Sequence, residues 1–235
     1  MKKLLVLATV MLPVLIVSCS KDKSESPDES VPGEIQSVDL GLSVMWGDRN
    51  LGAASPSDYG KYYAWGETEA KSVYTWESYK WCNGSYTTLM KYNTDNTMMS
   101  YGIVDNRIQL VPEDDVACVK LGGGWRIPTQ SEIDELIATK DDSSYKWVWK
   151  SIKGHEGWQI TYLLNNKSIF LPAADKWNEY LPKFGWAGYY WASSIVRGII
   201  VDEPNKAWCL YFDSEEVDRY GYNRSDGCPV RPVID

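Results

Sequence analysis

The sequence predicts an α+β domain that is rich in loops and built mostly from antiparallel strands with two short helices. Three observations lead to this class. Alternating apolar residues indicate several short strands, two segments carry helix-capping signals, and residues 66–109 form a polar stretch with weak periodicity. A stretch of that length without regular structure is unusual in a compact domain, so we expect long loops.

The strands are predicted from side chains that alternate with a period of two, as on a half-buried sheet. Residues 38–46 show this alternation from Val38 to Trp46, and residues 61–65 are a second short candidate. Asn165-Asn166 is typical of a tight turn that accepts positive φ. The remaining predicted strands are residues 145–149, 158–164, 169–171, 188–193, 207–213 and 228–233.

Two helices follow the polar stretch. The first is predicted to begin at Pro112, where the missing N–H costs nothing and the acidic residues 113–115 suit the positive end of the helix dipole, and to end at Gly122. The second begins with a capping box made by Thr129 and Glu132, followed by an apolar stripe at positions 133, 136 and 137. Both are short, so each needs packing against a sheet.

The N-terminal residues predict export and lipidation. A basic start at Lys2 and Lys3 precedes an apolar run over residues 4–17, which is shorter than the about 20 residues that span a bilayer. The sequence IVSC at 16–19 resembles a lipobox, so we expect a signal peptide over residues 1–18 and a lipid on Cys19. An ordinary signal peptide with a chance cysteine is the alternative. Residues 19–35 are polar and predict a disordered tether, followed by one domain over residues 36–235.

The composition limits the classes of partner that the protein can bind. The chain has a net charge of −8, or −10 without Lys2 and Lys3, and no basic cluster, which argues against binding nucleic acid. It holds 12 Trp and 16 Tyr against 3 Phe. Trp and Tyr combine apolar area with a polar tip, which leaves open a sugar or a protein as the ligand. Many of these residues are expected to lie in the core.

Four cysteines remain besides Cys19, and they allow three full pairings. Their spacing matches no zinc signature, and the sequence selects none of the pairings. If Cys209 and Cys228 lie on neighbouring strands, a bridge between them would stabilise the fold by about 3 kcal/mol. The four are Cys82, Cys118, Cys209 and Cys228.

Six segments, in order, resemble one family: VDLGLSV at 38–44 with Trp46, YAWGE at 63–67, GGWRIPT at 123–129, LPAA at 171–174, GYYWASS at 188–194 and VRPV at 230–233. Together they resemble the Fibrobacter succinogenes major paralogous domain, which is common in lipoproteins of gut Bacteroidota. The resemblance covers residues 36–234 and implies a C-type lectin-like fold. Formylglycine-generating enzymes and the variable proteins of diversity-generating retroelements share that fold.

The resemblance implies a ligand surface on the last strands and loops, of the kind that retroelements diversify. We expect it between residues 195 and 228, where apolar, aromatic and charged residues mix without amphipathic order. We expect no ligand contact from residues 66–109. Two ordinary surface loops and a hairpin are the alternative. The predicted ligand-binding residues are Ile195, Arg197, Trp208, Glu215, Arg219, Tyr220, Tyr222, Asn223 and Asp226.

Other candidate sites are weaker. Glu203-Pro204-Asn205 matches a calcium-binding triplet of C-type lectins but lacks its downstream Trp-Asn-Asp partner, so we interpret it as a proline turn in an acidic loop. Cys209 and Cys228 are too far apart in sequence for the copper site of formylglycine-generating enzymes. His155 is interpreted as an exposed turn residue, and Arg126 and Arg231 as framework arginines that hold strand ends together.

The sequence therefore predicts a non-enzymatic outer-membrane lipoprotein, on the periplasmic or cell-surface side, that binds a surface protein or a glycan. We expect no metal or cofactor, no nucleic acid, and membrane contact only through the lipid. One rival is a cell-surface enzyme acting on glycans or proteins, for which a pair of carboxylates would serve. The other is a structural envelope lipoprotein. An enzyme would need convergent acid and base groups in a pocket.

Overall fold

The computed structural model describes residues 34–94, 101–178 and 185–235. The predicted signal peptide, Cys19 and all but the last two residues of the predicted tether lie outside the described residues. The described residues belong to one compact unit that extends to Asp235. Within them, no helix combines the length and the apolar character needed to cross a membrane.

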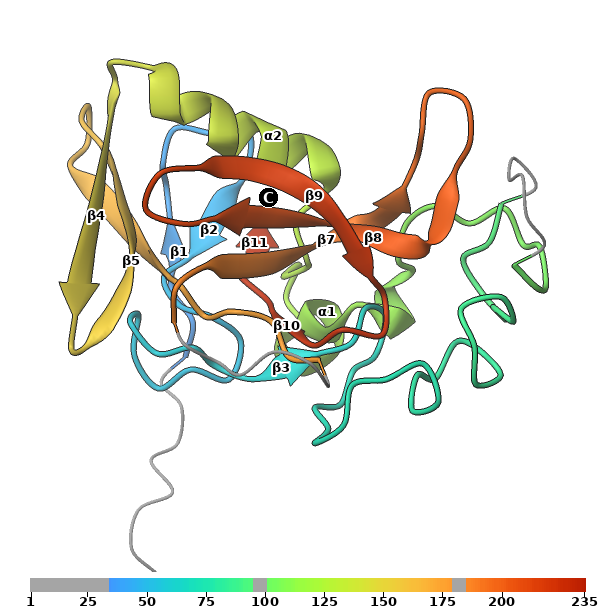
Figure 1. The fold of residues 1–235 in the computed structure, drawn as a ribbon. Coiled ribbons are helices and arrows are strands. Elements are labelled where there is room, and N and C mark those ends of the chain that lie inside the picture. The colour runs from blue at the N-terminus through green and yellow to red at the C-terminus, as the bar shows by residue number, and fades with distance from the viewer. Residues whose placement is uncertain (1–33, 95–100, 179–184) are drawn as a thin grey trace, which may run out of the picture. The chain divides into compact units, whose positions relative to one another are not determined.

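The strands form four small sheets whose strand pairs are all antiparallel (Figure 1). The two smaller sheets consist of β1 (Ser37–Val38), β2 (Met45–Gly47) and β11 (Val233–Ile234), and of β3 (Tyr62–Tyr63) and β10 (Cys228–Pro229). The two larger sheets consist of β4 (Tyr145–Ile152), β5 (His155–Tyr162) and β6 (Lys167–Pro172), and of β7 (Gly188–Val196), β8 (Glu203–Phe212) and β9 (Val217–Asn223). With two short helices, this confirms the predicted α+β class.

The first and last strands of the domain share a sheet. In β11, Val233 pairs with Trp46 of β2, which places the C-terminus beside the beginning of the domain. The prediction of one continuous strand over residues 38–46 was wrong, because a turn at Gly41 separates β1 from β2. Gly41 has φ +71°, and a Cβ added there would lie 2.5 Å from the ring of Tyr162. The predicted strand over residues 228–233 is likewise divided into β10 and β11.

The helices form where their capping residues predict. Thr129 and Glu132 make both hydrogen bonds of the capping box, and α2 (Gln130–Ala138) follows. The first segment differs from the prediction: a 3₁₀ turn over Pro112–Asp114 precedes α1 (Val116–Leu121). The helix restarts because Asp115 acts as a new N-cap, whose carboxylate accepts hydrogen bonds from the amides of Ala117 and Cys118 at 2.8 and 3.1 Å.

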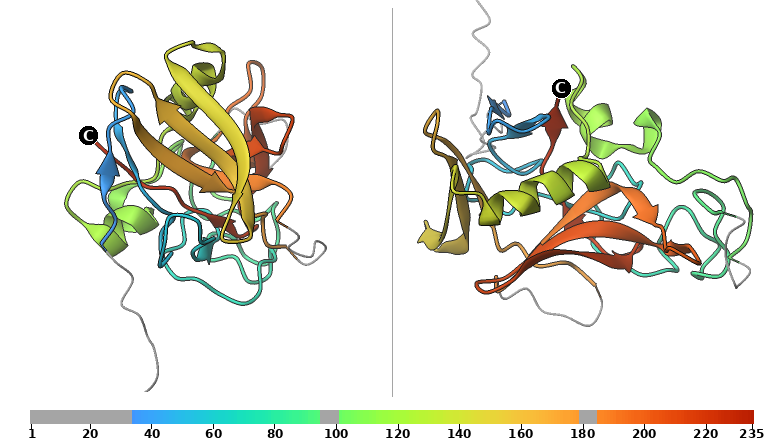
Figure 2. Two further views of the ribbon diagram at one scale, coloured as in Figure 1. Left: turned by 90° about the vertical axis from the view of Figure 1, so that its left-hand side faces the viewer. Right: turned by 90° about the horizontal axis from the view of Figure 1, so that it is seen from above.

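The sheet β7-β8-β9 lies between two apolar clusters. On one face α2 contacts all three strands (Figures 1 and 2), and Ile133 and Leu136 pack against Tyr190, Leu210 and Phe212. On the other face, a second cluster gathers Trp65, Trp191 and Cys209 around the amino-terminal part of α1, with Val116 and Ala117. These two layers form the rigid frame that holds the last strands in place.

Buried Arg231 connects two of the sheets. Its guanidinium donates to the carbonyl of Gly47 in β2 at 3.0 Å, to the carbonyl of Phe170 in β6 at 2.7 Å, and to Oδ1 of Asn50 at 2.9 Å. Arg126 joins Glu132 and Asp235 through ion pairs. Both arginines therefore hold structural elements together, as the sequence predicted.

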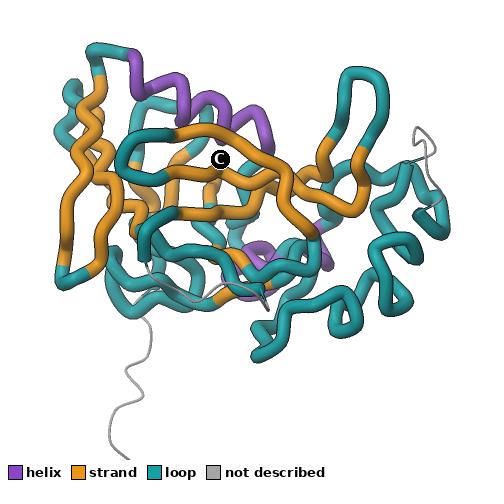
Figure 3. The backbone as a smooth tube through the Cα atoms, viewed as in Figure 1, coloured by secondary structure: helices purple, strands orange, loops and turns teal. Residues whose placement is uncertain are grey.

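The predicted loop-rich region is confirmed: residues 66–94 and 101–109 contain no helix and no named strand (Figure 3). Hydrogen bonds within turns and from side chains hold this region instead. The hydroxyl of Tyr79 donates to the carbonyl of Trp65 at 2.7 Å, and Arg224, which is fully buried, donates to the carbonyls of Lys91 and Tyr92 at 3.1 and 3.2 Å. The segment is thus held at separate points rather than by a sheet ladder.

Candidate functional site

Four tyrosines from three adjacent strands lie together on the sheet β7-β8-β9. Tyr189 of β7 pairs with Tyr211 of β8 in register, and their ring centroids are 5.2 Å apart. On β9, Tyr220 and Tyr222 are two residues apart and so share a face. The Tyr222 ring lies 5.1 Å from that of Tyr189, and the Tyr220 ring lies 5.5 Å from that of Tyr211. We call this group the tyrosine row.

The phenols of the tyrosine row keep their protons at neutral pH. Burial raises the pKa of Tyr189 to about 12. The pKa of the exposed Tyr220 also rises to about 12, chiefly because its hydroxyl donates to the Glu216 carboxylate. A protonated phenol both donates and accepts hydrogen bonds, so the row offers aromatic area with polar tips.

A lysine and an aspartate continue the tyrosine row beyond β9. The ammonium of Lys176 lies 4.6 Å from the centroid of Tyr222 and 2.6 Å from Oδ2 of Asp226. Asp226 is only 4% exposed. Burial raises the pKa of Asp226, and Lys176 only partly offsets that effect. This ion pair closes the end of the row and begins a groove.

The groove has a volume of about 280 Å³ and lies between two distant parts of the chain. One wall comes from the long polar segment, residues 66–109, and presents Tyr74, Trp76 and Glu77. The other wall includes Asn223 and Asp226. Aromatic rings beside carboxylate and amide groups are suited to a ligand with both an apolar face and hydrogen-bonding groups.

The structure brings together four of the nine predicted ligand residues. Tyr220 and Tyr222 belong to the tyrosine row, and Asn223 and Asp226 line the groove. They lie on and just after β9, which the sequence did not predict as a strand; its mixture of charged, aromatic and glycine residues hides the alternation.

The other five predicted residues lie elsewhere. The prediction that Ile195 lies on the ligand surface was wrong, because this residue is 0% exposed. Its amide donates to the carbonyl of Ile108 at 3.0 Å. Trp208 packs in the cluster beneath α2, with Arg219 over its ring. Arg197 lies past the end of β7, and Glu215 lies in the turn between β8 and β9.

Several residues of this site were missed by sequence reasoning. Tyr189 and Tyr211 were assigned to strands, but only the register places them beside Tyr220. Tyr74 and Trp76 carry no local signal. The expectation that residues 66–109 make no ligand contact stays a prediction, although the structure places these two residues in the wall of the groove.

Two of the weaker candidate sites also differ from their predicted structure. Glu203-Pro204-Asn205 begins β8 and is not a turn, and Glu203 forms an ion pair with Lys206. His155 is half-buried at the start of β5, with its ring centroid 4.5 Å from that of Tyr59, so it is not an exposed turn residue. Among the described residues, no group of three His, Cys, Asp or Glu side chains could hold a metal ion.

Comparison of the chain with family models, with curated proteins and with solved structures finds no match.

Proposed function

We propose that this protein is a non-enzymatic, lipid-anchored extracytoplasmic protein that binds a surface protein or a glycan through the tyrosine row and the adjoining groove. One observation carries the proposal: four tyrosines from three strands meet beside an open groove that has aromatic and polar walls. Tyrosine presents rigid contact area that loses little entropy on binding. The sheet and α2 hold these rings before a ligand arrives, which lowers the cost of association.

The fold supports a C-type lectin-like assignment within this proposal. Antiparallel sheets, adjacent chain ends and long loop segments agree with such a scaffold, and the candidate surface uses its last strands. Membership of the Fibrobacter succinogenes major paralogous domain and diversification of the surface by a retroelement belong to the same proposal. A near-copy of the coding sequence for residues 195–228 that differs at adenines, beside a reverse-transcriptase gene, is the genomic observation that tests diversification.

Anchoring by Cys19 places the binding surface at the outer membrane, on its periplasmic or cell-surface side. Metabolic labelling with a fatty-acid analogue should mark the wild type and not Cys19→Ala. Equal labelling of both proteins would rule out this anchor.

The binding test uses glycan and surface-protein arrays to find a ligand, followed by alanine variants. Tyr220, which is 40% exposed, and Trp76, which lines the groove, are the informative positions. Each substitution should weaken binding by about 2 kcal/mol if its ring is an anchor. Leu164→Ala, at an exposed position after β5, is the matched control that removes apolar surface elsewhere. Full affinity in both variants, with folding confirmed by circular dichroism, would refute the proposed surface.

A hydrolase is the second candidate function, because Glu77 and Asp226 line the same groove. Of these two carboxyls, Asp226 is the one with a raised pKa, as a general acid requires. Its burial and its ion pair with Lys176 favour a structural role instead. Incubation of the array ligand with wild type and Asp226→Asn distinguishes the two: cleavage products from the wild type alone would replace binding by catalysis.

A further inference from the structure

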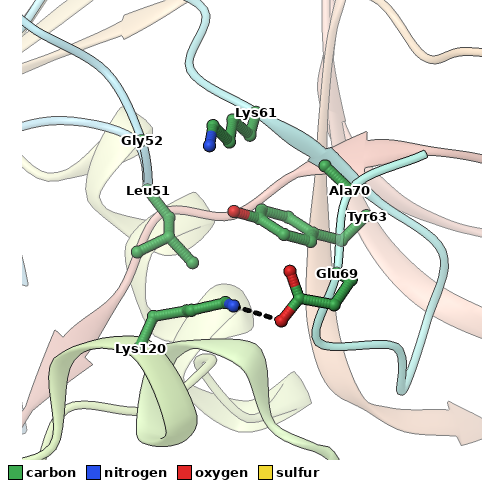
Figure 4. Close-up of a pocket in the computed structure, with 7 residues that line it drawn as sticks. All are labelled: Leu51, Gly52, Lys61, Tyr63, Glu69, Ala70 and Lys120. Atoms are coloured by element: carbon green, nitrogen blue, oxygen red, sulfur yellow. Dashed lines mark hydrogen bonds and ion pairs between the residues drawn. The ribbon is translucent and has the colours of Figure 1, made fainter. Parts of the chain in front are cut away.

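A second pocket lies away from the groove and shares none of its lining residues. Its volume is about 270 Å³, and it lies between β3, the chain before it and α1 (Figure 4). Leu51 forms an apolar wall, and Lys61, Tyr63, Glu69 and Lys120 bring polar groups to the pocket.

Two donors in this pocket lack protein partners. The side chain of Tyr63 is almost entirely buried, at 3% exposure, yet its hydroxyl makes no hydrogen bond within the described part of the chain. Burial raises the pKa of Tyr63 to about 12, so the hydroxyl keeps its proton and can donate. Across residues 34–94, 101–178 and 185–235, the ammonium of Lys61 has no carboxylate partner either. Lys61 is exposed and both residues line the pocket, so the two donors are available to an acceptor that binds there.

The position of Lys61 is set by the chain beside it. Gly52 has φ +76°, and a Cβ added there would lie 2.8 Å from Cγ of Lys61. The absent Cβ leaves room for the lysine stem, which runs along the wall of the pocket with its ammonium on the same side as the Tyr63 hydroxyl (Figure 4).

An exposed ion pair forms the opposite side. Lys120 of α1 pairs with Glu69, whose side chain is 79% exposed. Exposed pairs contribute little stability, about 0–1 kcal/mol, so Lys120 is free to turn toward a ligand anion. Glu69 then remains as an acceptor for ligand hydroxyl groups.

The charges define the ligand. Two ammonium groups and one carboxylate leave the pocket with one excess positive charge, on a chain whose net charge is −8. A monoanion neutralises that excess, whereas a dianion would leave the pocket with a net negative charge. The volume lies just below the about 300 Å³ at which sites for drug-sized ligands begin, which favours a ligand the size of one sugar ring.

We propose that this pocket binds an acidic monosaccharide: its carboxylate accepts from Lys61, Lys120 and the Tyr63 hydroxyl, its ring packs on Leu51, and its hydroxyl groups donate to Glu69. This site goes beyond the proposed function and does not depend on the groove.

The experiment is isothermal titration of the full chain in detergent with glucuronate, glucose and inorganic phosphate. Glucuronate should bind saturably and more weakly as salt is added, because the attraction is ionic. Glucose should show no measurable binding, and phosphate should bind less tightly than glucuronate. Glucose binding equal to that of glucuronate, or tighter binding of phosphate, would overturn the proposal.

Two substitutions locate the site. Lys61→Gln and Tyr63→Phe should each weaken glucuronate binding by about tenfold, since each removes a donor to the carboxylate. Lys153→Gln, at the turn between β4 and β5, removes the same charge elsewhere and should bind as the wild type does. Amide resonances of Gly52 and Ala70 should shift with glucuronate. Unchanged affinity in both pocket variants, or shifts confined to residues 223–226, would refute this pocket and leave the groove proposal standing.

Discussion

The guanidinium carbon of Arg219 lies 4.0 Å from the centroid of the Trp208 ring. The Nε of the same arginine donates to Oδ1 of Asp134 at 2.6 Å. Asp134 belongs to α2, whereas Trp208 and Arg219 belong to β8 and β9. Trp208 and Arg219, which were predicted to contact a ligand, therefore hold α2 against the sheet.

Replacing Arg219 by Ala should lower stability without affecting ligand binding. The substitution removes a cation–π contact and an ion pair, so we expect a loss of about 1–2 kcal/mol in the free energy of unfolding. Urea denaturation measures this loss. Lys206→Ala breaks an exposed ion pair on β8 and should change stability by less than about 0.5 kcal/mol. Equal stability of both variants would contradict the assigned role of Arg219.

Glu132 should make the fold sensitive to acid. Burial raises the pKa of Glu132, but hydrogen bonds from Arg126 and from the Thr129 amide outweigh burial and leave that pKa below its ordinary value. Because the folded pKa lies below the unfolded one, the ionised carboxylate stabilises the fold above the unfolded pKa of about 4.3. This contribution is lost as pH falls through the folded pKa. The stability difference between wild type and Glu132→Gln should therefore be largest near neutral pH and shrink on acidification. A difference that stays constant with pH would disprove this linkage.

Arg231→Met should be strongly destabilising. It leaves Asn50 Oδ1 and the carbonyls of Gly47 and Phe170 without their donor in a buried site, at a cost of about 3 kcal/mol or more. Arg231→Lys should recover little, because an ammonium cannot reproduce the planar arrangement of donors. Arg107→Met, at a half-exposed arginine, is the control. Chemical denaturation measures the free energy of unfolding of the three variants. A stability of Arg231→Lys close to that of the wild type would show that the planar geometry does not matter.

Cys209 and Cys228 should form the only disulfide if the four cysteines are oxidised during export. Both thiols are fully buried. Burial and the hydrogen bond with Cys209 raise the pKa of Cys228 well above its ordinary value, so this thiol is unreactive once folded and must oxidise earlier. Peptide mapping without reductant should find this cross-link, with Cys82 and Cys118 alkylated. A cross-link that includes Cys82 would contradict the structure.

The capping signals of α2 were read correctly from the sequence, whereas contacts between distant segments were not. The capping box at Thr129 and Glu132 depends on residues three apart, so α2 could be predicted. Gly41 looked like one position of an alternating strand, because its turn depends on the packed Tyr162 ring. Strand β9 escaped notice because Asp218, Arg219 and Gly221 interrupt its apolar period; its ladder with β8 supplies the stability that its own residues do not.

The candidate site depended even more on register. Tyr189 and Tyr220 are 31 positions apart in the printed sequence, and only two antiparallel ladders bring them onto one row. The groove joins Trp76 to Asn223, which no periodicity connects. Composition indicated that aromatic residues matter; their grouping needed the fold.

The way the long polar segment is held also determines where the chain can be lengthened. Arg224 donates to its backbone at Lys91 and Tyr92, and Tyr79, within the segment, donates through its hydroxyl to the carbonyl of Trp65. Between those contacts, Gly84 has no neighbour within 4 Å of an added Cβ. Residues inserted at Gly84 would extend into solvent and leave both contacts in place. That turn is therefore suited to carry an epitope tag or a fluorescent label that reports the protein's position on intact cells.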